Sequence, residues 1–262
     1  MAEEAPLAGG VANAGAVSRV GDVVHRPATR FTPAAHRFMH ALHERGFPGV
    51  PEPLEPAPDG RERLAFVPGD VALPPYPRWA QEDATLASVA RLMRRLHDAA
   101  AGVSTEGPWS EDLADPCGGD IVCHNDVCLE NVVFDDGVAV ALLDWEFAAP
   151  GRSVYDLAQM ARICVPVTDD VSAARLGWTR PDKPARLRLV CDSYELDSAG
   201  RAELLPAVDD AINAHGQLVR RRVDAGDPNF VALWNAVGGI EWYDRRRRWW
   251  SEAREMFEEA LA

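Results

Sequence analysis

The chain has 262 residues, of which 47% are hydrophobic and 26% are charged, and its formal net charge is −14 at pH 7. A chain of this length and composition can bury a sizeable core, as one large globular domain or as two lobes. The acidic balance argues against a nucleic-acid partner and permits a cationic substrate, and no apolar run reaches the roughly eighteen residues that a membrane span needs.

The N-terminal segment is rich in glycine and ends in a strand-like run. Glycines lie between apolar residues over 7–21, and the run 22–26 stops at Pro27. We predict two or three antiparallel strands with a glycine-rich turn near Gly9-Gly10 or over 13–15. Such a turn lets backbone N–H groups approach phosphates, but these glycines do not form the P-loop pattern and also occur in ordinary turns.

Two helices and a strand come next in the chain. Thr32, as the N-cap, and Pro33 mark the start of a helix that ends at Gly46. A strand over 63–67 is broken by Pro68. Apolar residues repeating at intervals of three and four then predict a long helix over 79–101.

The most informative segment is 121–146, which reads IVCHNDVCLENVVFDDGVAVALLDWE. Two short apolar runs flank Asp135-Asp136-Gly137, and an Asp-Gly pair in this setting predicts a β-hairpin. His124, Asp126 and Asn131 precede the hairpin, and Asp144 follows it. The hairpin therefore places polar side chains on both of its flanks.

Phosphoryl transfer can use these residue types. The reaction needs a carboxylate that orients the attacking hydroxyl and accepts its proton, and oxygen ligands that hold Mg²⁺ against the phosphates. Asp126 suits the first task, and Asn131 and Asp144 suit the second. A lone histidine or loop aspartate is more often structural, so the combination carries the argument.

The remainder of the chain, from Arg162 onward, is predicted to be helical, with one helix over 201–225 and one or two over 230–262. Its aromatic residues either line a substrate pocket, with Glu241 and Asp244 receiving a cationic group, or pack in the core. They are Trp234, Trp242, Tyr243, Trp249 and Trp250.

The spacing His124-x-Asp126-x-x-x-x-Asn131, followed by Asp144-Trp145-Glu146, resembles the aminoglycoside phosphotransferase-like family. The resemblance implies an α+β, bilobal protein-kinase-like fold with a small antiparallel-sheet N-lobe and a mainly helical C-lobe. It also implies that Asp126 is the catalytic base, that Asn131 and Asp144 bind the metal, and that His124 supports the loop. Asp156, in an Asp-Leu-Ala segment typical of the family, is interpreted as structural, either capping its helix or bracing the loop.

The same resemblance implies an N-terminal nucleotide-binding lobe at 1–67, a hinge at 68–70 and a C-terminal lobe at 71–262. Backbone groups of Phe66 and Val67 would then face the adenine. The family uses a lysine on the strand before the first helix and a glutamate on that helix, but the only lysine here is Lys183. Arg26 or His25 takes the lysine position, and His36 lies where the glutamate is expected.

The cysteines offer a second interpretation of the central segment. Cys117, Cys123, His124 and Cys128 are close in sequence, but their spacing matches none of the paired patterns of structural zinc sites. An odd number of irregularly spaced cysteines and the lack of a secretory signal favour reduced thiols and a cytoplasmic location.

The sequence as a whole predicts an ATP- or GTP-dependent, Mg²⁺-using phosphotransferase that acts on a hydroxyl of a small molecule, such as an aminoglycoside, another antibiotic or a metabolite. Such an activity would give antibiotic resistance if the acceptor is an antibiotic. Two alternatives stay open. One is a non-catalytic, kinase-like immunity protein that sequesters a small molecule or a peptide toxin, and the other is a protein kinase, although no Ala-Pro-Glu segment is present.

Overall fold

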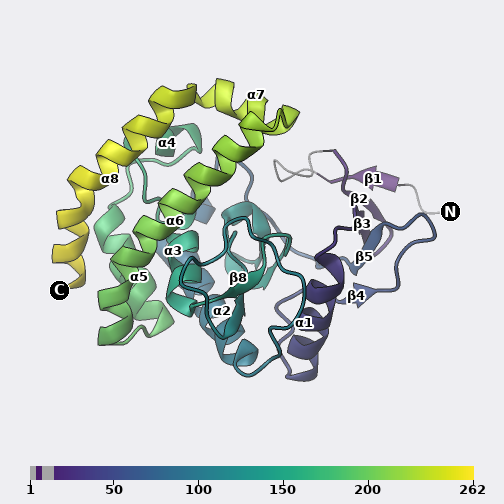
Figure 1. Ribbon diagram of the computed structural model, residues 1–262. Coiled ribbons are helices and arrows are strands. Elements are labelled where there is room, and N and C mark those ends of the chain that lie inside the picture. The colour runs from purple at the N-terminus through teal and green to yellow at the C-terminus, as the bar shows by residue number, and fades with distance from the viewer. Residues whose placement is uncertain (1–3, 8–14) are drawn as a thin grey trace.

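The computed structural model describes residues 4–7 and 15–262. A small antiparallel sheet and one helix form one end of the molecule, and helices form most of the rest (Figure 1). This architecture confirms the predicted α+β fold with a small sheet region and a mainly helical remainder. The glycine-rich turn expected at Gly9-Gly10 or over 13–15 falls, except for Gly15, outside the described residues.

The sheet has five strands in the order β1-β2-β3-β5-β4. Their bounds are β1 Glu4–Pro6, β2 Ser18–Val20, β3 Val23–Arg26, β4 Pro53–Leu54 and β5 Glu62–Ala65. Strands β3 and β5 are antiparallel neighbours, and their register sets Arg26 directly opposite Glu62. Because side chains opposite each other in a ladder share one face, these two residues project together.

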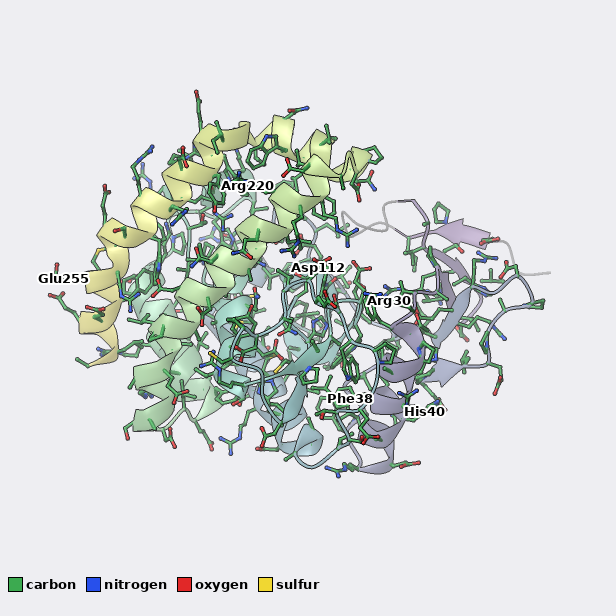
Figure 2. All side chains as sticks on the ribbon, viewed as in Figure 1. Arg30, Phe38, His40, Asp112, Arg220 and Glu255 are labelled. Atoms are coloured by element: carbon green, nitrogen blue, oxygen red, sulfur yellow. The ribbon has the colours of Figure 1, made fainter. Side chains whose placement is uncertain are left out.

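Helix α1, Thr32–Glu44, follows the sheet. Thr32 is its first residue and Phe31 occupies the N-cap position, so the predicted cap was wrong by one residue. Figure 2 shows Phe38 pointing from α1 into the molecule and His40 on the opposite side of the helix. Phe38 is buried against Trp145, with 5.5 Å between the ring centroids, so α1 packs directly on the segment that follows the hairpin.

The helical part begins with a 3₁₀ turn, η1 Arg78–Gln81, and then helix α2, Asp83–Ala100. The long helix predicted over 79–101 is therefore split, because Glu82 between the two is extended. The helices that follow are α3 Ser153–Cys164, α4 Asp170–Arg175, α5 Lys183–Tyr194, α6 Ser198–Asp224, α7 Pro228–Val237 and α8 Gly239–Leu261. None of the helices over the described ranges combines the length and apolarity needed to cross a bilayer.

The predicted hairpin consists of β7 Val132–Asp135 and β8 Val138–Leu142. Asp136 and Gly137 both have positive φ, 47° and 77°, as a tight two-residue turn requires. A second strand pair, β6 Ile121–Cys123 with β9 Ala149–Gly151, encloses the same region. The two pairs hold between them the loop at 124–131, which ends in the turn η2 Leu129–Asn131, and the loop at 143–148.

Two apolar clusters fill the interior. The larger runs from α1 through α2, the hairpin and α3 to α5 and α8. The smaller joins Leu113 and Phe147 to α6, α7 and the start of α8. Asp112, near the middle of Figure 2, adds ion pairs to Arg221 and Arg222 at 2.6 and 2.9 Å, which tie the 101–120 segment to the end of α6.

Candidate active site

The loop at 124–131 brings Asp126 and Asn131 together. The Asn131 side-chain nitrogen donates to the Asp126 carboxylate at 3.2 Å and to the Asp126 backbone carbonyl at 3.0 Å. The backbone N–H of Leu143 donates to the Asn131 carbonyl at 2.7 Å, so Asp144 lies beside the same pair. The three residues selected from the sequence therefore meet at one place.

His124 and Asp156 support this loop from within the protein. His124 is fully buried; its Nε2 donates to the Leu143 carbonyl at 2.7 Å, and its Nδ1 accepts from the Asp126 backbone N–H at 3.3 Å. Burial lowers the pKa of His124, which fits a neutral ring with one donor and one acceptor. The ring links the loop that carries Asp126 to the loop that carries Asp144.

Asp156 is also fully buried, and it lies inside the first turn of α3 without capping it. Its carboxylate accepts from the backbone N–H groups of His124 and Asn125, both at 2.8 Å, and from Nε2 of His97 at 3.1 Å. Burial alone would raise the pKa of Asp156, but the bond and charge of His97, together with His124, lower it. Of the two roles proposed for Asp156, the geometry supports bracing the loop.

Asp144 adopts an unusual backbone conformation, with φ of +62°. A non-glycine residue in this region is strained and persists where surrounding contacts impose it, a situation common at functional sites. Its Oδ1 is buried and, apart from an ionic contact of 2.8 Å with Arg26, has no hydrogen-bond partner within the described chain. The side chain is thus directed at a cation.

Arg26 is the centre of a buried ion-pair network. Its Nη2 contacts Asp144 at 2.8 Å and Glu146 at 3.4 Å, and its Nε lies 3.2 Å from Glu62. Burial opposes the charge, but the three carboxylates raise the pKa of Arg26 above its ordinary value. Glu62 is bound in turn by Nε2 of His36 at 2.7 Å.

The network contains a buried cation–carboxylate pair, formed by Arg26 and Glu62. Arg26 stands where the lysine was expected, Glu62 of β5 supplies the carboxylate, and His36 of α1 holds the carboxylate from behind. Sequence reasoning missed Glu62, because it sought the glutamate on α1. The signal was present in the strand register, since a buried Glu62 faces Arg26 across the ladder.

The other residues proposed for nucleotide binding lie apart from Arg26. His25 precedes Arg26 on β3, so its side chain projects from the opposite face of the sheet. The Phe66 backbone N–H donates to the Asp22 carbonyl at 2.9 Å, and the Arg19 guanidinium covers the Phe66 ring at 3.4 Å. Val67 makes no backbone hydrogen bond among the described residues, so its backbone groups are available to a ligand.

A cavity of about 560 Å³ opens onto the loop. Asp126, Asn131 and Asp144 line it at one end, together with Glu130, which accepts a 2.8 Å hydrogen bond from the Tyr76 hydroxyl. The rest of its wall is largely apolar and comes mainly from α3, α6, α7 and the segment at 73–76, with Leu7 and Gly15 from the N-terminal part. None of the five aromatic residues noted in the C-terminal helices lines it, and Trp242 and Trp250 are buried in the core.

Asp126 lies half-buried in the wall of this cavity. Burial raises the pKa of Asp126 to about 8; Arg162 acts in the opposite direction, whereas Asp144, Glu146 and Glu130 reinforce the rise. A carboxyl whose pKa lies near the working pH can accept a proton effectively.

The oxygen atoms present fit a magnesium ion shared with phosphates. The side-chain oxygen of Asn131 accepts no hydrogen bond from the described residues, and Oδ1 of Asp144 is buried with Arg26 as its ionic contact. Over 4–7 and 15–262, no three His, Cys, Asp or Glu side chains converge on a metal-binding geometry. A nucleotide would therefore have to complete the coordination, which is how Mg²⁺ usually binds in kinases.

Part of the chain matches a known protein family, and one characterised protein is similar over most of its length. Residues 118–190 match the phosphotransferase enzyme family. The chain is 29% identical to the trifolitoxin immunity protein of Rhizobium leguminosarum bv. trifolii, a match that covers 94% of this chain and 95% of that protein.

Two solved structures show the same fold. One is a choline/ethanolamine kinase family protein from Mesorhizobium loti, with a TM-score of 0.63 and 14% identity over 99% of this chain and 91% of that chain. The other is an amicoumacin kinase in complex with AMP-PNP and Ca²⁺, with a TM-score of 0.61 and 11% identity over 89% of this chain and 86% of that chain. The fold is the protein-kinase-like one, and the resemblance to the aminoglycoside phosphotransferase-like family is confirmed.

Proposed function

We propose that this protein, a kinase-type phosphotransferase by its fold and its matched segment, transfers the γ-phosphate of ATP or GTP to a hydroxyl of a small molecule. One observation carries the proposal: Asp126, Asn131 and Asp144 line the end of a cavity of about 560 Å³. A cavity of this size suits a small molecule. A relative of the same fold is an amicoumacin kinase, which supports an antibiotic or a related metabolite as the acceptor.

In this proposal Asp126 orients the acceptor hydroxyl and takes its proton. The Asn131 amide holds the Asp126 carboxylate, and His124 and Asp156 fix the loop, so the base is placed before the substrate arrives. Asn131 and Asp144 would hold Mg²⁺, which when bound neutralises charge on the phosphates. Arg26, positioned by Glu62, would bind phosphate oxygens through its planar guanidinium.

The direct test is a phosphorylation screen with mass spectrometry as the readout. The protein is incubated with ATP or GTP, Mg²⁺ and a panel of hydroxylated antibiotics and metabolites, next to the Asp126→Asn variant. One acceptor that gains a phosphoryl group with the wild type and not with the variant supports the proposal. Equal product with both proteins would contradict the role of Asp126.

A second candidate function is sequestration of a small molecule or a peptide toxin without catalysis. Two observations favour it. Asp144, the proposed metal ligand, is already paired with Arg26 at 2.8 Å, and one relative is an immunity protein. A protein that only sequesters its ligand needs no metal-dependent nucleotide site. Nucleotide binding that is independent of Mg²⁺, or absent from the folded protein, would favour this candidate.

A further inference from the structure

A buried arginine, Arg162, faces the cavity without a carboxylate of the described residues in ion-pair contact. Arg162 of α3 lines the cavity, although only 3% of its surface is exposed. Its Nε donates to Oε1 of Gln159 at 3.3 Å, and no carboxylate of residues 4–7 and 15–262 comes within ion-pair distance of it. Gln159 is itself fixed by the Tyr155 hydroxyl at 2.8 Å. The guanidinium is therefore held in place while its two terminal nitrogens remain without hydrogen bonds.

A second unpaired polar group comes from the neighbouring helix. His215 of α6 lines the same cavity, and its Nδ1 is buried and has no hydrogen-bond partner among the described residues. Burial and the charges of Arg162 and Arg246 lower the pKa of His215 well below its ordinary value, so the ring is neutral. A neutral imidazole carries one N–H, so Arg162 and His215 offer donors on adjacent parts of the wall.

The charges behind this wall are mainly positive. Arg246 of α8 lies close enough for Arg162 to lower its pKa, and it donates to Thr168 at 3.0 Å. The acidic residue nearby, Asp169, is already paired with Arg245 at 2.9 Å. Burial lowers the pKa of Arg162, and the charge of Asp126 opposes this effect without forming an ion pair with Arg162. The same cavity is also lined by four carboxyl groups, so its cationic character is confined to the part of the wall that Arg162 and His215 form. The four carboxyl groups are those of Asp126, Glu130, Asp144 and Glu146.

The cavity wall next to these donors is apolar. Leu218 and Val219 of α6 and Phe230 and Leu233 of α7 all line it. A buried charge is costly without a partner, and convergent donors next to an apolar wall suit an anionic group. The arrangement therefore combines a site for a negative group with a surface for a hydrocarbon body.

We propose that the cavity binds an amphiphilic hydroxy acid, with its carboxylate on Arg162 and His215 and its apolar body against α6 and α7. The hydroxyl would then lie toward Asp126, and only this last point rests on the proposed phosphotransferase function. Such a ligand differs from the cationic substrate that the overall charge permits. Arg162 would be the residue that sets this specificity.

The test compares three compounds that share a chain and a hydroxyl and differ in one terminal group. They are 3-hydroxydecanoate, 3-hydroxydecanamide and 1-aminodecan-3-ol, titrated by calorimetry into the nucleotide-free protein. We expect the carboxylate to bind at least about tenfold more tightly than the amide or the amine, because it completes charge-assisted hydrogen bonds. No nucleotide is used, so failure here is separate from failure of phosphoryl transfer.

Arg162→Met removes the charge and keeps a side chain of similar length. It should abolish the preference for the carboxylate and raise the melting temperature of the free protein, since an unpaired buried charge is lost. The exposed Arg248→Met is the matched control and should keep the preference. If Arg162→Met does not fold, the same titration is carried out with Arg162→Gln, which should also lose the preference for the carboxylate.

Three results would overturn the proposal. They are equal or tighter binding of the amine by the wild type, a carboxylate preference that survives loss of the Arg162 charge, and no binding of any of the three compounds at millimolar concentration. A preference that is lost only in the Arg162 variants supports it.

Discussion

The loop at 124–131 and the Arg26 network both lie next to Asp144, but the sequence reveals them to different extents. His124, Asp126 and Asn131 belong to one short loop, so their spacing is visible in the sequence. Arg26, His36 and Glu62 come from β3, α1 and β5, and only the fold brings them together. A motif within one short segment can be recognised from the sequence, whereas a network that depends on strand register can be recognised only from the structure.

The two regions also differ in how firmly they are held. The Asp156 carboxylate is fully buried and accepts hydrogen bonds from three donors, which hold the loop at 124–131 in place. Nε of Arg26 is buried and makes ionic contacts without a well-aligned hydrogen bond. The loop is therefore held by hydrogen bonds to one buried carboxylate, whereas Arg26 is held mainly by ionic contacts with three carboxylates. The predictions below test this difference.

The largest effect is expected for Asp126→Asn. Loss of the base should reduce phosphoryl transfer by about 10²–10⁴-fold. Nucleotide affinity should stay within about threefold, because Asp126 is assigned to the acceptor side of the site. Initial rates and calorimetry on the same preparation separate the two effects, and a variant with wild-type rates would remove Asp126 from the mechanism.

Asp156→Ala tests whether the loop is held as described. The change leaves two backbone N–H groups and His97 without their acceptor, so the free energy of unfolding should fall by about 3–5 kcal/mol. Asp98→Ala is the matched control on the surface of α2, where the exposed pair with Arg94 is worth less than about 1 kcal/mol. Urea denaturation measures both, and similar losses would mean that the buried network adds nothing.

Glu62→Gln tests whether Glu62 of β5 positions Arg26 within the ion-pair network. Without the carboxylate, Arg26 keeps Asp144 and Glu146 but loses the partner that orients it from its own sheet. We expect nucleotide affinity to fall about tenfold, which corresponds to about 1.4 kcal/mol, with folding retained. Glu55→Gln, on an exposed position nearby, should bind nucleotide as the wild type does. Equal affinity in the two variants would show that Glu62 does not position Arg26.

The last prediction concerns how the stability of the protein changes with pH through the carboxyl of Asp126. Burial raises its pKa to about 8 in the folded protein, so the folded state binds this proton more tightly than the unfolded state does. The contribution of Asp126 to stability is therefore lost as the pH rises from about 4 to about 8. The free energy of unfolding of Asp126→Asn, relative to that of the wild type, should therefore increase by about 1–2 kcal/mol from pH 5 to pH 8. Denaturation at both pH values checks this, and a difference independent of pH would contradict the raised pKa.

Much of the fold could be predicted because its signals are local. The Asp136-Gly137 turn, the apolar face of α1 and the periodicity of α2 each depend on neighbouring residues, and the structure has the corresponding elements. The errors at helix starts, at Thr32 and at residue 79, arose where capping and a 3₁₀ turn compete with periodicity.

The candidate site was only partly accessible from the sequence. Asp126, Asn131 and Asp144 followed from a resemblance to a known family. Glu62 required the β3–β5 register, and Arg162 looks like any arginine on a helix until α6 buries it beside the cavity. The surroundings of Glu62 and Arg162 are set by contacts between segments that are distant in the sequence. The spacing of residues along the chain does not reveal such contacts.

The most direct test of the account is calorimetric titration of ATP and GTP, with and without Mg²⁺, into the wild type and Asp144→Ala. We expect binding that requires both Mg²⁺ and Asp144, because the phosphates would complete the coordination that Asn131 and Asp144 begin. Binding unaffected by either, or no binding by the folded wild-type protein, would contradict the phosphotransferase assignment and leave sequestration as the better account.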